Sequence, residues 1–373
     1  MRLSPRTRAA TAAAALACAA ALTLTACGSA ADSDSDGITV VASTNVWGSV
    51  AQAVAGDRLQ VRSLITEPSA DPHSYEASPA DAAAISDASL VVYNGGGYDQ
   101  FVDDILESTN TAAATVDAFA LFESGESSDL HAGHDHGAEA TVGAGAEATV
   151  GAGAEAHDGA GAEAHDGAEA THDGGHEEDS HAEDSHSGDV HEGHDHGGIN
   201  EHVWYDLATA DAVAYTVADR LAELDPEGAD VYRANATAFH TRLHEVSDRT
   251  ATVAAAHPQA PIAQTEPIAH YLVLAAALND VTPTDFTNAV ENGTDPSPAS
   301  IAATRQLLLD KQVRVLIYNP QTEDKVSREM RSAAEQAGIP VVEVSETLPE
   351  GLDYVQWQTG TVDDLAAALG APA

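Results

Sequence analysis

The sequence predicts an α/β protein with two lobes, each built on a small, mainly parallel sheet flanked by helices and joined by one long helix. Short apolar runs alternate with helical segments over residues 38–122 and again over residues 258–373. Strands that alternate with helices in this way form parallel sheets. A helical stretch of about 30 residues lies between the two regions and would reach roughly 45 Å, which is enough to connect two lobes.

The first 26 residues have the features of a secretory signal. Three arginines in the first eight residues precede an apolar, alanine-rich run from residue 9 to residue 24, which is too short and wrongly flanked for a spanning helix. The following "LTAC" resembles a bacterial lipobox, which implies cleavage before Cys27 and lipid on its sulfur. We therefore expect an extracytoplasmic protein anchored to the cell membrane at Cys27, with residues 27–37 as a flexible tether. The alternative is an ordinary cleaved signal followed by a free cysteine.

Cysteine content and charge exclude several classes of function. The other cysteine, Cys18, lies in the signal, so the mature chain has neither an intramolecular disulfide nor a thiolate metal site. The chain has 60 acidic and 15 basic residues, with no lysine or arginine between Arg62 and Arg220. Such a surface repels nucleic acid and attracts cations, so we expect no nucleic-acid partner.

The elements of the first lobe follow from their apolar patterns and turn residues. Strands are expected at 38–44, 59–65 and 89–95, with helices at 47–55 and 79–87. Residues 199–225 are expected to complete this lobe after an interruption.

The interruption, residues 123–198, is expected to be a disordered insertion. It contains an octad repeat, which is followed by a tract of histidine, acidic residues and glycine, and this composition cannot bury a core. Twelve of the 18 histidines lie here. Two similar heptapeptides, "HAGHDHG" and "HEGHDHG", contain His131, His134, His136, His191, His194 and His196. Imidazoles and carboxylates suit Zn²⁺, so we hypothesise that the insertion gathers zinc. The alternative is a solubilising spacer.

The linking helix is expected over residues 226–257. Asp225 can cap it and Pro226 suits its first turn. Apolar residues spaced by three and four form one stripe along it, from Tyr232 to Val253. His240 and His244 lie off this stripe, and we expect them to form part of a solvated face.

The second lobe repeats the alternation of strands and helices. Strands are expected at 260–266, 312–319 and 339–345, with helices at 298–311, 324–337 and 361–369. Gly338 is expected to end the second of these helices.

Four polar residues stand at strand ends or on stiff loops and could bind a metal. His73 follows a proline, His202 opens the segment after the insertion, and Glu266 and Glu346 follow predicted strands. Ligands gather at the carboxyl ends of parallel strands, and two imidazoles with two carboxylates suit a divalent metal. The alternatives are a core role for His202 beside Trp204 and solvated strand-end carboxylates.

Three further residues could assist this site. His270 could approach the cleft between the two lobes and act as a substitute ligand. Asn319 and Gln321 end another predicted strand and could orient a ligand.

The complete pattern resembles the metal-binding lipoproteins that serve bacterial ABC importers of zinc and manganese, the cluster A-I solute-binding proteins. "DPHSYEASPAD" is similar to the family's D-P-H-x-Y-E-P-S-P-x-D, and "NEHVWYDL" to its N-P-H-V-W-L-D-P, with Glu201 and Leu207 in place of both prolines. "TEPIAHYL" and "SETLPEGLDYVQWQ" resemble two later motifs, with Glu346 where many members have aspartate. The resemblance covers nearly all of the folded chain.

This resemblance implies that His73, His202, Glu266 and Glu346 are the metal ligands. It also implies two four-stranded lobes joined by a rigid helix, with the metal in the cleft between them. Ligating histidines must be neutral, so affinity should fall as the pH drops below about 6.5.

The expected function is that of a receptor and not of an enzyme. It would bind one Zn²⁺ and deliver it, as a monomer, to a membrane permease driven by a cytoplasmic ATPase. The histidine-rich insertion favours zinc, whereas Glu266 moves the site towards oxygen ligands and Mn²⁺ or Fe²⁺. A surface lipoprotein for metal buffering or adhesion, and a secreted metalloenzyme, are the remaining alternatives.

Overall fold

The computed structural model describes residues 37–67, 72, 75–125 and 199–370. These residues belong to one compact unit that contains two lobes. None of the described helices is both long and apolar enough to cross a membrane. Cys27, His73 and the six named histidines of the insertion lie outside the described residues.

The first lobe is a parallel four-stranded sheet in the order β2-β1-β3-β4. Its elements are β1 (Val40–Thr44), α1 (Asn45–Ala55), β2 (Val61–Ile65), α2 (Pro79–Ser86), β3 (Leu90–Tyr93), α3 (Phe101–Thr109), β4 (Ala114–Asp117) and α4 (Ala118–Ser124). After the insertion, a 3₁₀ turn (Val203–Tyr205) and α6 (Leu207–Leu224) complete it. The central strand β1 is buried throughout, which agrees with its continuous apolar sequence.

The second lobe has the same architecture, with a parallel sheet in the order β6-β5-β7-β8. Its elements are β5 (Pro261–Gln264), a 3₁₀ turn (Pro267–Ala269), α8 (His270–Ala275), β6 (Asn279–Asp280), α9 (Thr284–Glu291), α10 (Pro298–Leu309), β7 (Leu316–Tyr318), α11 (Lys325–Ala337), β8 (Val341–Glu343) and α12 (Tyr354–Leu369). The predicted fold class of two parallel-sheet lobes is therefore confirmed.

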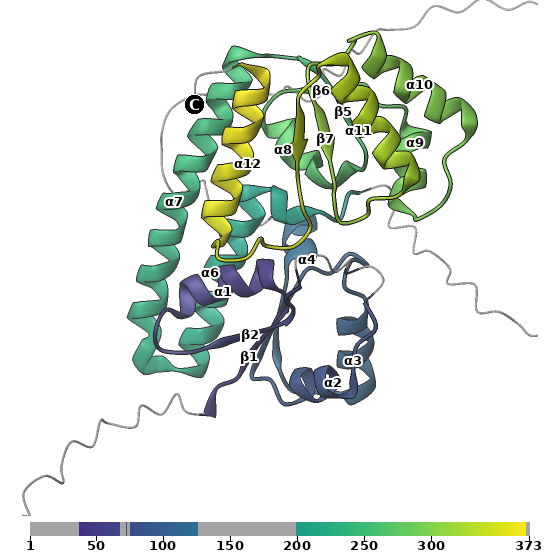
Figure 1. Cartoon of the computed structure of the whole chain (residues 1–373). Helices are drawn as coiled ribbons and strands as arrows, with labels where there is room; N and C mark the ends of the chain where they lie inside the picture. The colour runs from purple at the N-terminus through teal and green to yellow at the C-terminus, as the bar shows by residue number, and fades with distance from the viewer. Residues whose placement is uncertain (1–36, 68–71, 73–74, 126–198, 371–373) are drawn as a thin grey trace, which may run out of the picture. The chain divides into compact units, whose positions relative to one another are not determined.

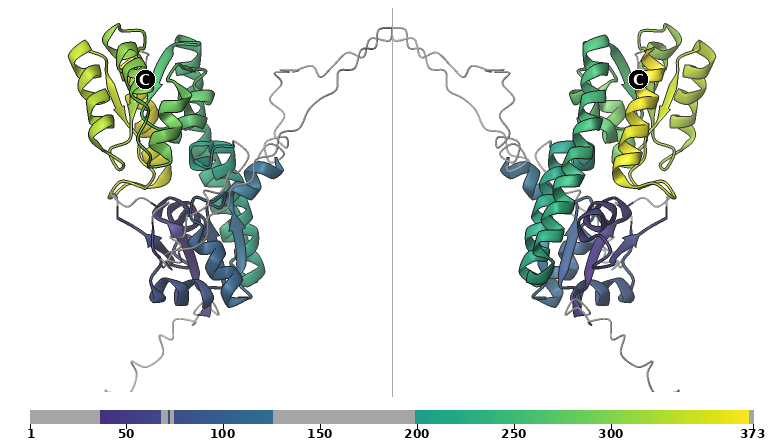
Figure 2. Two further views of the ribbon diagram at one scale, coloured as in Figure 1. Left: turned by 90° about the vertical axis from the view of Figure 1, so that its right-hand side faces the viewer. Right: turned by 90° about the vertical axis from the view of Figure 1, so that its left-hand side faces the viewer.

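One 28-residue helix, α7 (Ala229–Ala256), connects the lobes. It packs against α1 and α6 of the first lobe and against α8 and α12 of the second (Figure 1). In both views of Figure 2, the longer of the two teal helices runs beside the purple-to-blue lobe and the green-to-yellow lobe. Its buried side chains are those of the predicted stripe: Tyr232, Ala236, Phe239, Leu243, Val246, Thr250 and Val253.

Several boundaries differ from the predicted ones because local capping decided them. Residues 226–228 form a 3₁₀ turn that Asp225 caps, so α7 itself begins at Ala229. The last helix begins at Tyr354 and not at residue 361, because Asp353 forms a capping box with Gln356. Helix α4 continues to Ser124, past the predicted lobe boundary at residue 122.

Candidate metal centre

The second sheet brings three predicted side chains to one edge. Glu266 follows β5, Asn319 follows β7 and Glu346 follows β8, and these three parallel strands are neighbours. Carboxyl ends of parallel strands meet at the same edge of a sheet. All three side chains are buried, with at most 3% of each residue exposed. The two glutamates are therefore not the solvated strand-end carboxylates of the alternative interpretation.

Asn319 connects the two glutamates directly. Its Nδ2 donates to Glu266 Oε2 over 2.7 Å and to Glu346 Oε1 over 2.9 Å. Thr322 donates its hydroxyl hydrogen to the other Glu266 oxygen. Hydrogen bonds of this kind orient carboxylates that bind metals. Asn319 thus holds both carboxylates beside one another.

Gln321 positions the backbone of Glu346. Its Oε1 accepts from the Glu346 backbone N–H over 2.5 Å, and its Nε2 donates to Thr347 Oγ1 over 2.7 Å. Its own N–H donates to Asn319 Oδ1 over 2.9 Å. The two polar residues after β7 therefore form one network with Glu346.

His202 is completely buried at the start of the segment that follows the insertion. Its Nδ1 lies 3.1 Å from Asn200 Oδ1. Because an amide oxygen only accepts, Nδ1 carries the proton and Nε2 is the nitrogen that would coordinate a metal. The ring also lies edge-on to Trp204, with ring centroids 5.0 Å apart, so packing and hydrogen bonding both fix its orientation.

Glu291 is the site residue that sequence reasoning missed. It ends α9, and its Oε1 lies 3.2 Å from His202 Nε2. Two atoms that coordinate one zinc ion at about 2.0–2.1 Å are about 3.3 Å apart when the angle at the metal is tetrahedral. The observed separation of 3.2 Å is that of a histidine–carboxylate ion pair and is also close to the spacing of two neighbouring ligands of one ion. Nothing in the sequence distinguished Glu291 among the 60 acidic residues of the chain.

Glu201 completes a cluster with these two residues. One possible ligand atom from each of Glu201, His202 and Glu291 lies within 4.8 Å of the others. Glu201 stands where the resembled motif has a proline, so a carboxylate replaces a residue that cannot bind a metal.

A cavity of about 580 Å³ lies next to these groups. Among the described residues, those lining it include Glu266, Glu291, Glu346, Asp295 and Asp324, with no lysine or arginine. An acidic cavity of this kind attracts cations. Its chemistry suits a hard or borderline divalent metal ion.

The two lobes touch close to this cavity. The Tyr205 hydroxyl donates to the Ser345 backbone oxygen over 2.9 Å. Asn45 and Leu348 exchange two hydrogen bonds of 2.9 and 2.8 Å. The segment that contains Glu346 is thus hydrogen-bonded to the first lobe both before the insertion, at Asn45, and after it, at Tyr205.

His270 is not brought to the cavity. It lies against Tyr271, with ring centroids 5.1 Å apart, and is not among the residues that line the cavity in the described chain. Burial lowers the pKa of its imidazole, although Asp280 raises it in part. His202 is likewise absent from the described lining of this cavity, so the role of His270 as a substitute ligand stays a prediction.

The two-lobed α/β fold is shared by several solved structures. Solved structures with this fold include the periplasmic zinc-binding protein TroA of Treponema pallidum, with a TM-score of 0.60 and 14% identity over 89% of this chain and 99% of that one. The laminin-binding protein Lmb of Streptococcus agalactiae has a TM-score of 0.59 and 18% identity over 89% of this chain and 100% of that one.

The sequence also identifies a family. Residues 40–368 match the family described as "Zinc-uptake complex component A periplasmic", and the chain belongs to that family. The manganese-binding lipoprotein MntA of Halalkalibacterium halodurans is 23% identical over 57% of this chain, and the zinc-binding protein AdcA of Streptococcus pyogenes serotype M3 is 23% identical over 80%. In both cases, the match spans about half the length of the relative, 48%.

Proposed function

We propose that this chain is an extracytoplasmic receptor that binds one Zn²⁺ in the acidic cavity and delivers it to an ABC permease driven by a cytoplasmic ATPase. The observation that carries the proposal is the separation of 3.2 Å between His202 Nε2 and Glu291 Oε1, next to a cavity that two further buried glutamates line. Family membership supports the role in metal uptake.

The proposed ligands are His73, His202, Glu266 and Glu346, with Glu291 as an additional carboxylate. His202 would coordinate through Nε2, because Nδ1 is bonded to Asn200. Glu266 and Glu346 would supply oxygen ligands in the orientation that their hydrogen bonds with Asn319 give them. His73, which lies between β2 and α2 in the sequence, would supply the second imidazole. Imidazole and carboxylate ligands together are typical of zinc sites.

The proposed location rests on the N-terminal sequence. Residues 1–26 would be removed as a signal, and lipid on Cys27 would anchor the mature protein to the cell membrane. Release of the protein from membranes by Cys27→Ser, measured by fractionation and immunoblotting, tests this part separately.

Metal binding is tested on a variant that begins at Asp36 and has residues 128–197 replaced by a short Gly/Ser link. Competition titration with a chelator, together with native mass spectrometry, would give the affinity and the number of bound ions. We expect one tightly bound Zn²⁺, weakened by His73→Ala and by His202→Ala. Glu245→Gln, an exposed substitution on α7, is the control. Retention of full affinity in both histidine variants would refute the ligand assignment.

Manganese is the second candidate, and a specific observation favours it. Three of the proposed ligands next to the cavity are carboxylates, and oxygen-rich sites suit Mn²⁺ better than zinc. One relative is named for manganese and another for zinc. Tighter binding of Mn²⁺ than of Zn²⁺ in the same titration would decide for manganese.

The insertion is proposed to gather zinc for this site. Its histidines would bind several ions weakly and exchange them quickly. Removing the insertion should slow zinc uptake at scarce zinc without changing the affinity of the cavity. Unchanged uptake in cells grown with a zinc chelator would count against this role.

A further inference from the structure

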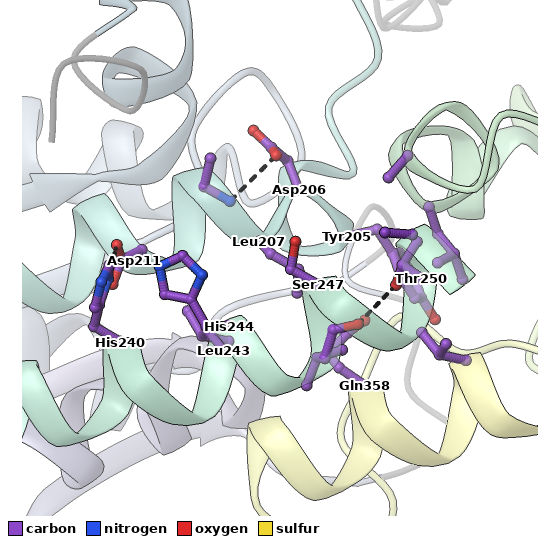
Figure 3. A pocket seen from close by; sticks show the side chains of 16 residues that line it. Tyr205, Asp206, Leu207, Asp211, His240, Leu243, His244, Ser247, Thr250 and Gln358 are labelled. Carbon is purple, nitrogen blue, oxygen red and sulfur yellow. Dashed lines mark hydrogen bonds and ion pairs between the residues drawn. The ribbon is translucent and has the colours of Figure 1, made fainter. Parts of the chain in front are cut away.

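A second cavity, of about 240 Å³, lies along α7 and is separate from the acidic cavity. Segments from both lobes contribute to its lining: Tyr205–Ala208 and Asp211 from the first, and parts of α8 and α12 from the second. Most of the lining is apolar, but two histidines of α7 stand at one end beside Asp211 (Figure 3). The proposed metal-uptake function does not use this cluster.

His240 is held by a buried carboxylate. Its Nδ1 lies 2.7 Å from Oδ2 of Asp211, which belongs to α6 and is 1% exposed. Only 13% of the His240 side chain is exposed. The expectation of a solvated face was therefore wrong for His240, because α6 covers it and supplies its hydrogen-bond acceptor.

His244 lies one helical turn further along α7 and is exposed, as predicted. Residues four apart on a helix face the same side. The centroids of the two imidazole rings are 4.5 Å apart, and Figure 3 shows both rings on the side of α7 that faces the cavity. Two histidines at this spacing form one of the standard chelating pairs for zinc.

The Asp211 carboxylate orients one histidine of this pair. Histidines that bind a metal commonly donate their other ring N–H to a carboxylate, which fixes the tautomer and orients the ring. With Nδ1 of His240 bonded to Asp211, Nε2 is the nitrogen that would coordinate an ion shared with His244. The cavity has room for the water molecules that a site with two protein ligands requires.

We propose that His240 and His244 form a second divalent metal site, occupied by Zn²⁺ with water in the remaining positions, and that Asp211 positions His240 without coordinating the ion. The ion would be held on the linking helix, next to residues of both lobes. With only two protein ligands, the site binds zinc more weakly than the proposed centre in the acidic cavity. It is independent of that centre and would exist even if the acidic cavity bound no metal.

The test must resolve individual histidines, because the full chain contains 18. We would label the full-length protein with diethyl pyrocarbonate over a series of free Zn²⁺ concentrations fixed by a chelator buffer. Peptide mass spectrometry would then give the labelling of each histidine. We expect labelling of His244 to fall as zinc rises, and the residual labelling of His240 to fall in parallel. His257, at the end of the same helix, is the internal control.

Two variants separate the roles of the residues. His244→Gln changes an exposed side chain and should abolish the protection of His240 by zinc. Asp211→Asn should raise the zinc concentration at which labelling of His244 falls by half, by about tenfold or more. Mg²⁺ should protect neither histidine, in the full-length protein or in either variant. Labelling of His244 that does not change with zinc would overturn the proposal, as would protection of His240 that persists in His244→Gln. An unchanged half-protection point in Asp211→Asn would overturn the positioning role of Asp211.

Discussion

Replacing Asn319 by alanine tests whether the edge of the second sheet is built to hold a metal. One nitrogen, Asn319 Nδ2, donates to both Glu266 and Glu346 over 2.7 and 2.9 Å. Loss of a hydrogen-bonding partner of a metal ligand typically costs about 10–100-fold in affinity, which corresponds to about 1.4–2.7 kcal/mol. Because Asn319→Ala releases two carboxylates together, we expect a loss near the upper end of this range.

The same substitution should destabilise the metal-free protein. Both carboxylates are almost completely buried, and loss of a hydrogen bond to a buried charged group costs about 1–3 kcal/mol. We expect the free energy of unfolding to fall by about 2–4 kcal/mol for the two carboxylates together. Zinc competition titrations and urea unfolding in the presence of a chelator measure the two effects separately.

The control is Asn292→Ala, which removes an asparagine from the loop that lines the same cavity. Its Nδ2 donates to the backbone oxygen of Asn288, in an exposed position. We expect this variant to bind zinc within about twofold of the unchanged protein, or less than 0.5 kcal/mol. If Asn319→Ala also stays within twofold and unfolds at the same urea concentration, the two glutamates do not depend on Asn319 and the reasoning is wrong.

Three further predictions concern other parts of the structure. Glu291→Gln should weaken Mn²⁺ binding more than Zn²⁺ binding, by about tenfold, because it removes an anionic oxygen ligand; competition titrations with both ions measure the ratio. Burial raises the pKa of Asp99 to about 6, above about 3.9 in the unfolded chain. Stability should therefore fall by about 2 kcal/mol as the pH rises from 4 to 6, and Asp99→Asn should flatten this part of the curve in urea unfolding. Gly228→Ala should destabilise the fold by about 1–3 kcal/mol, because a Cβ there would lie 2.4 Å from Asp225 Oδ2 and 2.6 Å from the Tyr232 ring.

Each of these predictions has its own contrary result. An unchanged preference between the two ions in Glu291→Gln would mean that Glu291 is not a ligand. A sloped stability curve that persists in Asp99→Asn would assign the pH dependence to another group. Melting of Gly228→Ala within about 1 °C of the unchanged protein would mean that the residues around Asp225 can shift at little cost.

Alternating strands and helices, and one continuous apolar stripe, were sufficient to predict two parallel-sheet lobes joined by a long helix. These features could be predicted because they depend on periodicity along the chain, and the stripe from Tyr232 to Val253 is buried as its spacing required. Short elements such as β6, with two residues, and α8, with six, carry too little periodicity to be recognised. Hydrogen bonds to neighbours in the sheet and packing against other helices form them instead.

Part of the metal centre could also be predicted, because some of its residues follow strands that the sequence pattern marks. Glu266, Asn319 and Glu346 each follow a predicted strand, and parallel strands of one sheet end at a common edge. Glu291 ends a helix that no strand pattern marks, and only the tertiary structure brings its Oε1 to 3.2 Å from His202 Nε2.

The sequence by itself determined the repeated α/β architecture, the long connecting helix and the residue types offered to a metal, since each depends on local spacing and on side-chain chemistry. Only the tertiary structure decided which of these residues share a site. It placed Glu291 beside His202 and covered His240 with Asp211 of α6. The physical reason is that contacts between residues distant in sequence depend on how helices and sheets pack, which no pattern along one segment contains.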